Sequence, residues 1–467
     1  MMKKLYEKTF YRFLKGWLPL MIPFFIKHIE LLRWIARILS SLVGICYLYQ
    51  IIYLFAPWMQ RFAARIRNRV RHGKPPAPAM VHTDAAGAPS PLRIGTGEGY
   101  RVGILIAARN EEKVLPYLLD SIRAQDYPGS IRTFVVADNC TDRTAEAAEA
   151  HGARVYRREN RKQVGKGFAL RYLLEQITED GSFSDIDIFL IFDADNLLRP
   201  DYVSEITRTF ALGYEAVCGY RNSKNALSNW ISAGYAVWYM HESIHMNRSR
   251  ALLGANCAVN GTGFGFTRAL LERLGGWRFF TLTEDLEFNT WCASHGVRIG
   301  YCHTAMLYDE QPTSFRQSWR QRTRWVQGGI QVSFKYAADL FRGLFSRRTR
   351  YSCFETITLS IWGYGSSALV SVFALLPALL AGTLPDILRA LILPILGMCA
   401  FLTVISALTV ASEWDNLGGS AGRRLAAVFT FPLFMLTYIP IGVCAFFTRF
   451  NWKPIEHNVA VSINDVR

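Results

Sequence analysis

Uncharged apolar segments stand toward both ends of the chain, and mixed patterns fill the middle. No charged residue occurs in 38–57, 356–385, 390–412 or 425–448. About 20 apolar residues without charge are enough for a helix to cross a bilayer. The pattern therefore predicts one transmembrane helix before the central region and about three after it, rather than a set of buried core helices.

Between these ends, strand-like and helical patterns alternate from Arg101 onward. Four short apolar runs read as buried strands, and three amphipathic runs between them read as helices: 101–109, 133–138, 153–158 and 187–195, then 110–125, 144–151 and 165–177. This alternation predicts an α/β fold whose mostly parallel sheet carries helices on both faces. Because such sheets bind ligands at the carboxyl ends of their strands, polar residues there are candidates for a site.

Basic residues account for the formal net charge of +16 and gather beside the apolar segments, in 61–74, in 316–350 and at Arg423 and Arg424. Positive residues next to membrane spans stay on the cytoplasmic side. We therefore expect a multi-pass protein of the plasma (inner) membrane with a cytoplasmic central domain. The juxtamembrane position favours membrane lipids over nucleic acid as the partner of this charge.

These patterns divide the chain into six parts. We expect an amphipathic interfacial helix and the first transmembrane helix in 1–60, a basic stretch and a Pro/Ala/Gly linker in 61–97, a cytosolic domain in 98–330, an interfacial helix in 331–355, the remaining transmembrane helices in 356–448 and a tail in 449–467.

Acidic residues end two of the predicted strands. Asp138 closes one, and Asp193 and Asp195 form a D-x-D pair at another. Two carboxylates this close repel each other unless a cation lies between them. Oxygen ligands favour Mg²⁺ or Mn²⁺, which usually share a substrate's phosphates. A metal-bound diphosphate is one interpretation, and a polar turn is the other.

Downstream motifs supply candidates for phosphate binding and proton transfer. Lys166 begins a helix beside glycines and could reach a phosphate. In TLTEDLEF, Thr281 and Glu284 have the spacing of a capping box, which leaves Asp285 as a candidate general base.

The stretch QRTRW places Gln321, Arg324 and Trp325 on one helical face. Arginine suits phosphate, and tryptophan suits the apolar face of a sugar. A basic helix at the membrane surface would also account for this stretch.

Taken in order, AARNEE, Asp138, the D-x-D pair, the TED triplet 283–285 and QRTRW resemble the membrane-embedded family 2 glycosyltransferases, such as cellulose, chitin, hyaluronan and poly-N-acetylglucosamine synthases. The resemblance covers about residues 100–330 and implies a GT-A fold. It implies contacts to UDP or its sugar from Ala107, Glu111, Asp138, Lys166, Asp193, Asp195, Gln321 and Arg324. Asp193 and Asp195 would hold the metal, Asp285 with Glu284 would supply the catalytic base, and Trp325, Gly261, Thr262 and Gly263 would bind the acceptor.

The resemblance also implies an inverting, metal-dependent transfer from UDP-glucose or UDP-N-acetylglucosamine to a growing β-linked polysaccharide that crosses the membrane. Transfer of a single sugar to a lipid or a short acceptor remains an alternative. The chain departs from the family at Asn139, where many relatives have Asp, and it lacks the gating-loop sequence of cellulose synthases, whose place the segment 451–457 could take.

Two further hypotheses compete with this one. HESIH, residues 241–245, matches the His-Glu-x-x-His pattern of zinc proteases, but no downstream third ligand is evident. The second hypothesis is a membrane transporter or scaffold with a degenerate, inactive domain. Against it, all the acids and QRTRW are intact.

Overall fold

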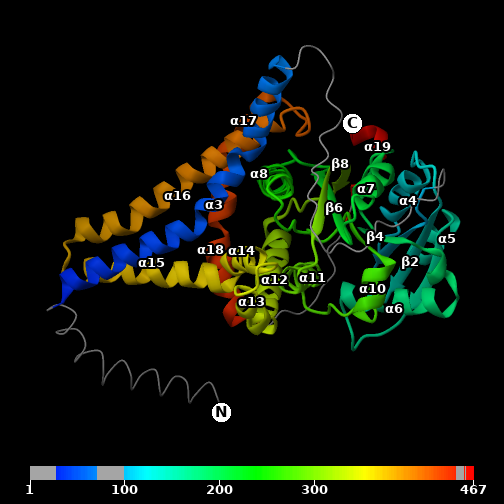
Figure 1. Ribbon diagram of the computed structural model, residues 1–467, viewed down its shortest axis with the longest axis horizontal. Helices are drawn as coiled ribbons and strands as arrows, with labels where there is room; N and C mark the ends of the chain where they lie inside the picture. The colour runs from blue at the N-terminus through cyan, green and yellow to red at the C-terminus, as the bar shows by residue number, and fades with distance from the viewer. Residues whose placement is uncertain (1–27, 71–98, 449–456, 458, 467) are drawn as a thin grey trace. The chain divides into compact units, whose positions relative to one another are not determined.

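The computed structural model describes residues 28–70, 99–448, 457 and 459–466 (Figure 1). Residues 1–27, which begin the first predicted part, and residues 71–97, which include the predicted Pro/Ala/Gly linker, lie outside the described residues. The described chain forms two compact units. The smaller takes in the described residues up to Ile51 together with Ile357–Leu402, and the larger takes in Ile52–Thr356 and the described residues from Thr403.

An eight-stranded sheet forms the centre of the larger unit, in the order β3-β2-β1-β4-β7-β6-β8-β5. Its strands are β1 (Val102–Ala108), β2 (Ile131–Asp138), β3 (Arg154–Arg158), β4 (Ile188–Asp193), β5 (Leu197–Leu198), β6 (Ala216–Ser223), β7 (Phe264–Thr267) and β8 (Ile299–Asp309). Strands β3, β2, β1 and β4 are parallel neighbours, and β6 pairs in parallel with β8. The prediction of a mostly parallel sheet is confirmed, but β7 is antiparallel to both of its neighbours.

Both faces of the sheet are buried, as the continuous apolar runs predicted. In β4, Phe189 and Ile191 join the core on one face, and Leu190 and Phe192 join the core on the other. Helices α6 (Lys166–Glu179), α10 (Arg268–Leu274) and α11 (Glu284–His295) cover the first face, and α4 (Leu115–Arg123), α5 (Thr144–Ala150) and α7 (Tyr202–Phe210) cover the second. Each large core side chain kept from water contributes about 1.5–3 kcal/mol, so these two layers hold the strand ends in place.

Further helices lie between the strands or after them in the chain. They are α8 (Trp230–His241), the π-helix η2 (Glu242–Asn247), α9 (Arg248–Leu252), α12 (Phe315–Lys335), α13 (Ala337–Gly343), α14 (Arg350–Thr358), the short 3₁₀ turn η1 (Ser182–Asp185) and the short α19 (Ile463–Val466). Of these, α8 and α12 border the site described below.

Four helical stretches are long and apolar enough to cross a membrane: Ile29–Gln60, Ile361–Leu380, Leu384–Ser412 and Ala421–Phe447. The first three belong to α3 (Ile29–Val70), α15 (Ile361–Ala381) and α16 (Leu384–Ser412). The fourth consists of two helices, α17 (Ala421–Leu436) and α18 (Tyr438–Phe447), separated at Thr437. The apolar segments predicted at both ends of the chain are therefore confirmed as helices of spanning length.

The HESIH residues take part in packing. His245 is fully buried, and its Nδ1 lies 3.2 Å from the carbonyl oxygen of Leu54. Glu242 pairs with Arg250 at 3.7 Å, so the acid between the histidines faces a guanidinium. Burial lowers the pKa of His241 to about 3 and keeps that ring neutral.

Candidate active site

Asp193, the last residue of β4, and Asp195, two residues later, lie at the carboxyl edge of the sheet. Asp193 is in register with Ala107 of the parallel strand β1. The Asp193 backbone N–H points to Asn196 Oδ1 at 3.1 Å and to Thr262 Oγ1 at 3.0 Å, which fixes the strand end. Asp195 is 3% exposed, and its Oδ2 accepts a hydrogen bond from the Glu310 N–H.

Lys166 reaches these acids from the first residue of α6. Its Nζ donates to the Asp193 carboxylate and, at 2.7 Å, to the Gly261 carbonyl. Burial alone would lower the pKa of Lys166, but Asp193, followed by Glu284 and Asp285, raises it above its ordinary value, so the ammonium stays charged. A cation is therefore placed at the D-x-D pair by the protein itself.

The TED triplet lies at the start of α11, where helix geometry differs from the predicted cap. The N-cap is Thr283, which makes no side-chain cap hydrogen bond, so the capping box from Thr281 to Glu284 is wrong. Glu287 holds the loop instead, because its Oε2 accepts from the N–H groups of Phe280 and Thr281 at 2.9 and 2.8 Å. Glu284 and Asp285 are thereby left to face the cavity.

The electrostatics of the triplet are unusual. Burial raises the pKa of Glu284 to about 7, with Asp285 adding to the rise and Lys166 and Arg324 opposing it. Glu284 therefore carries a proton over part of the neutral range. A carboxyl group that can hold or release a proton near pH 7 stands beside the candidate base.

QRTRW lies on α12 and closes the other side of the cavity. Arg324 Nη1 donates to the Leu282 carbonyl at 2.7 Å, which ties this helix to the loop that carries the TED triplet. Trp325 meets Tyr235 of α8 edge-on, with ring centroids 5.8 Å apart. As the helical spacing predicted, Gln321, Arg324 and Trp325 all line the cavity.

These elements enclose one cavity of about 400 Å³. Its lining includes most of the residues singled out by the sequence: Ala107, Glu111, Lys166, Asp193, Asp195, Gly261, Glu284, Asp285, Gln321, Arg324 and Trp325. Three others do not line it. Asp138 is buried and paired with Arg158, Thr262 is buried beneath Asp193, and Gly263 has a positive φ of 63° where a Cβ would lie 1.9 Å from Leu307.

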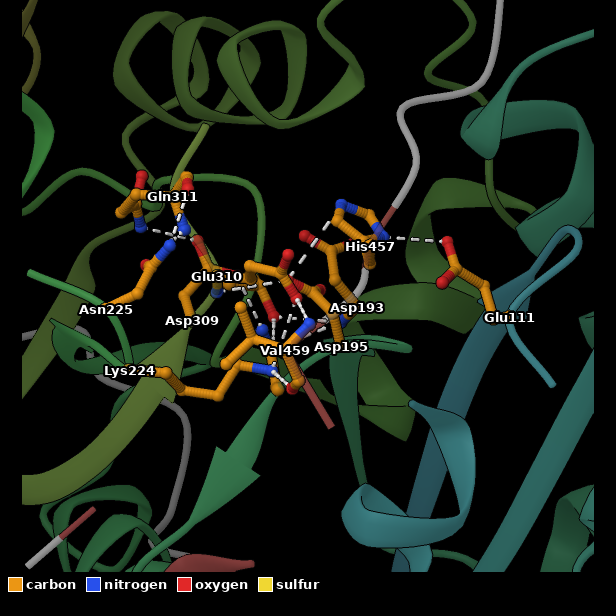
Figure 2. A network of polar contacts seen from close by, with 12 residues as sticks. Glu111, Asp193, Asp195, Lys224, Asn225, Asp309, Glu310, Gln311, His457 and Val459 are labelled. Atoms are coloured by element: carbon orange, nitrogen blue, oxygen red, sulfur yellow. Dashed lines mark hydrogen bonds and ion pairs between the residues drawn. The ribbon is translucent and has the colours of Figure 1, made fainter. Parts of the chain in front are cut away.

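Sequence reasoning missed a second set of polar residues around the D-x-D pair, shown in Figure 2. Asp309 ends β8 and accepts from Arg221 Nε at 3.0 Å and from Asn196 Nδ2 at 2.8 Å. The pattern that pointed to Asp138 could also have pointed to Asp309, because each acid is the last residue of a strand. Arg221 lies near the end of β6, a strand outside the alternating region 101–195.

His457 is the most distant of the missed residues in sequence. Its Nδ1 lies 2.9 Å from Glu111 Oε1, and its Nε2 lies 4.0 Å from Asp195 Oδ2 (Figure 2). Burial lowers the pKa of His457, but the carboxylates of Asp195 and Glu111 outweigh it and raise the pKa to about 10. The sequence offers only one hint of this residue, the tail segment 451–457, and no spacing rule links that segment to the cavity.

The acids could hold a divalent cation together with substrate oxygens. Asp193 and Asp195 present carboxylate oxygens at the cavity, which suit Mg²⁺ or Mn²⁺. Within the described part of the chain, no group of three His, Cys, Asp or Glu side chains is gathered as a ready ion site. Two carboxylates alone would leave the other coordination positions of such an ion to phosphates and water.

Residues 100–328 match the family model described as glycosyltransferase like family 2. The central domain belongs to the family 2 glycosyltransferases. With the strand order above, this membership identifies its fold as GT-A, and the expected enzyme class is confirmed.

The curated relatives include a β-monoglucosyldiacylglycerol synthase and a poly-β-1,6-N-acetyl-D-glucosamine synthase. The chain is 27% identical over 267 residues to a β-monoglucosyldiacylglycerol synthase of Synechocystis sp., covering 56% of this chain and 52% of the relative. It is 26% identical over 278 residues to a poly-β-1,6-N-acetyl-D-glucosamine synthase of Staphylococcus aureus, covering 56% of this chain and 62% of the relative. The chain thus spans about half to three fifths of the length of the curated relatives it matches.

Solved structures show a weaker likeness. A mannosyltransferase of Pyrobaculum calidifontis in complex with GDP-mannose and Mn²⁺ has a TM-score of 0.47 and 20% identity, covering 87% of this chain and 99% of that chain. TarS 1–349 of S. aureus in complex with UDP-GlcNAc has a TM-score of 0.38 and 13% identity, covering 73% and 92%.

Proposed function

We propose that the protein transfers a sugar from UDP-glucose or UDP-N-acetylglucosamine to an acceptor hydroxyl and inverts the anomeric configuration. The observation that carries this proposal is the single cavity that brings Asp193, Asp195, Lys166, Asp285 and Arg324 together. A diphosphate donor requires positive charge, which Lys166 and Arg324 supply. A hydroxyl acceptor requires a base, and Asp285 at the start of a helix can serve as one.

The proposed reaction follows from this arrangement. Asp285 takes the proton of the acceptor hydroxyl, and the oxygen attacks the anomeric carbon from the face opposite UDP. The bond between that carbon and the diphosphate oxygen breaks, and its electrons leave with UDP. Lys166 and Arg324 offset the charge that develops on the leaving group. When bound, a divalent cation held by Asp193 and Asp195 adds positive charge at the diphosphate.

For the product, we propose a β-linked polysaccharide that is extended processively and exported across the plasma membrane, with the catalytic domain in the cytoplasm. Trp325 offers an aromatic face to the acceptor's terminal sugar. The synthase of poly-β-1,6-N-acetyl-D-glucosamine among the relatives supports this choice. A single transfer to a lipid is the second candidate, supported by the similarity to β-monoglucosyldiacylglycerol synthase.

The test uses the full chain purified in detergent with radiolabelled UDP-glucose and UDP-N-acetylglucosamine, each offered with oligosaccharide primers and with diacylglycerol. We expect one donor to yield UDP and a labelled product whose length grows with time. Asp285→Asn should abolish transfer, while Asp120→Asn, an exposed acid on α4, should not. A lipid product with one sugar would establish the second candidate. Full activity of Asp285→Asn would refute the assigned base.

A further inference from the structure

The fourth apolar stretch, α17 and α18, is bound to the larger unit at both of its ends. Before α17, Glu413 accepts a hydrogen bond from Tyr220 of β6 at 2.7 Å, and the Asn416 carbonyl accepts from Asn222 at 3.1 Å. At the break between the helices, Thr437 Oγ1 accepts from Arg322 of α12 at 2.7 Å. The start and the end of α17 are therefore both anchored on the domain that holds the active site.

The next helix shows the same pattern. At the end of α18, Gln327 of α12 donates to the Ala445 carbonyl at 2.9 Å and to the Thr448 carbonyl at 2.5 Å. Since Arg322 and Gln327 lie five residues apart on one helix, α18 runs along α12. At 1.5 Å per residue its ten residues extend about 15 Å, half of the roughly 30 Å of a hydrocarbon core.

The packing of α17 also ties it to the domain. Phe434 fits against Gly234 of α8 so closely that a Cβ there would lie 2.3 Å from its ring. Arg322 is completely buried between the rings of Tyr235, Phe434 and Tyr438. A charged group enclosed this way holds the junction between α17 and α18 against the catalytic domain.

The other side of the pair remains apolar and exposed. Leu425, Phe429 and Leu433 recur at four-residue spacing along α17 and are 54%, 72% and 53% exposed. Ile439, Val443 and Phe446 of α18 are also more than half exposed. Arg423 and Arg424 flank it at the start of α17. An apolar stripe with basic residues at its border suits the headgroup boundary of a lipid bilayer.

The chain beyond α18 supplies an independent observation. His457 lies in the cavity beside Glu111 and Asp195, and Val459 is held on both sides, by its N–H to Glu310 Oε2 at 3.0 Å and by its carbonyl to Lys224 Nζ at 3.2 Å (Figure 2). The tail is thus on the same side of the membrane as the active site. An even number of crossings must separate the two, and α15, α16 and a spanning α17–α18 would give three.

We propose that α17 and α18 do not cross the membrane but lie in its surface on the side of the catalytic domain, with the face of Leu425, Phe429 and Leu433 against the lipid. Three helices, α3, α15 and α16, make the crossings. The arrangement returns the tail to the catalytic side, where His457 completes the wall of the donor site.

The test adds one cysteine at a time to the full chain and labels it with a membrane-impermeant maleimide in intact cells and in sealed inverted vesicles. Glu272→Cys marks the catalytic domain, Thr383→Cys marks the turn between α15 and α16, and Asn464→Cys marks the tail; all three positions are exposed. The wild-type chain, whose nine cysteines are buried or half-buried in the structure, gives the background.

We expect positions 272 and 464 to react from one side and position 383 from the other. Labelling of position 464 from the side of position 383 would show that α17–α18 crosses the membrane and would overturn the proposal. Labelling of all three from one side would overturn it as well, because α15 and α16 would then not cross. Labelling needs no turnover, so the result is independent of the sugar and the acceptor.

Discussion

Two adjacent glycines on α12 offer a matched test of how closely this helix must approach the TED triplet. A Cβ on Gly328 would lie 2.4 Å from Thr283 Oγ1, 2.6 Å from Cγ2 and 2.9 Å from Cβ. A Cβ on Gly329 would meet only Leu286 Cδ2, at an ordinary 3.7 Å. Gly328→Ala therefore separates α12 from the N-cap of α11, and Gly329→Ala leaves the two in place.

The two substitutions should change the stability of the protein by different amounts. Alanine in a helix interior is about 1 kcal/mol more favourable than glycine, so Gly329→Ala should raise stability by about that amount. Gly328→Ala gains the same term and loses about 1–3 kcal/mol to overpacking. The two variants should thus differ by about 1–3 kcal/mol. Because a misplacement of about 1 Å can cost about 100-fold in rate, kcat of Gly328→Ala should fall by ten-fold or more.

The assay compares apparent unfolding midpoints in detergent at one scan rate, together with kcat for UDP release. Thr283→Ala removes the two nearest atoms and should restore much of the activity of Gly328→Ala, since Thr283 Oγ1 makes no hydrogen bond to any described residue. Equal stability and equal kcat for the two glycine variants would refute the claim that contact between α12 and the TED loop sets the site.

Three further predictions concern charge in the cavity. Removing divalent ions with EDTA should abolish transfer, Mn²⁺ or Mg²⁺ should restore it, and activity that persists in EDTA would contradict the assignment of Asp193 and Asp195. Because burial raises the pKa of Glu284 to about 7, its contribution to stability is present below its ordinary pKa of 4.5 and is lost as the pH rises through 7. Unfolding midpoints should therefore show Glu284→Gln gaining on the wild type between pH 5 and pH 8, and a constant difference would argue against a raised pKa. His457→Gln removes a positive charge beside Asp195 and should raise KM for the donor several-fold with a smaller effect on kcat. Steady-state kinetics measures both, with Asn464→Ala, at an exposed position of the tail, as the control. The same change in KM for Asn464→Ala would show that the effect comes from the tail as a whole.

Much of the architecture follows from local pattern. Continuous apolar runs such as 188–192 have to be buried on both faces, and the helical runs between them must cover those faces, so the parallel half of the sheet was predictable. The helical spacing of Gln321, Arg324 and Trp325 likewise determined that they share a face. The uncharged segments identified helices of spanning length, because hydropathy is a property of composition.

Other features depend on contacts between residues far apart in the chain. The position of His457 beside Glu111 joins residues 346 apart, and nothing local in the tail encodes it. Hydropathy could not distinguish α17–α18 from a spanning helix, because it does not register the hydrogen bonds from Arg322 and Gln327 that hold both ends of α18 to α12. The predicted capping box at the start of α11 was wrong for a similar reason. The N–H groups of the loop donate to Glu287, in the first turn of the helix, and not to a cap residue. Local pattern determined which elements form, and tertiary packing decided which polar groups meet, because a side chain's partner depends on the whole path of the chain between them.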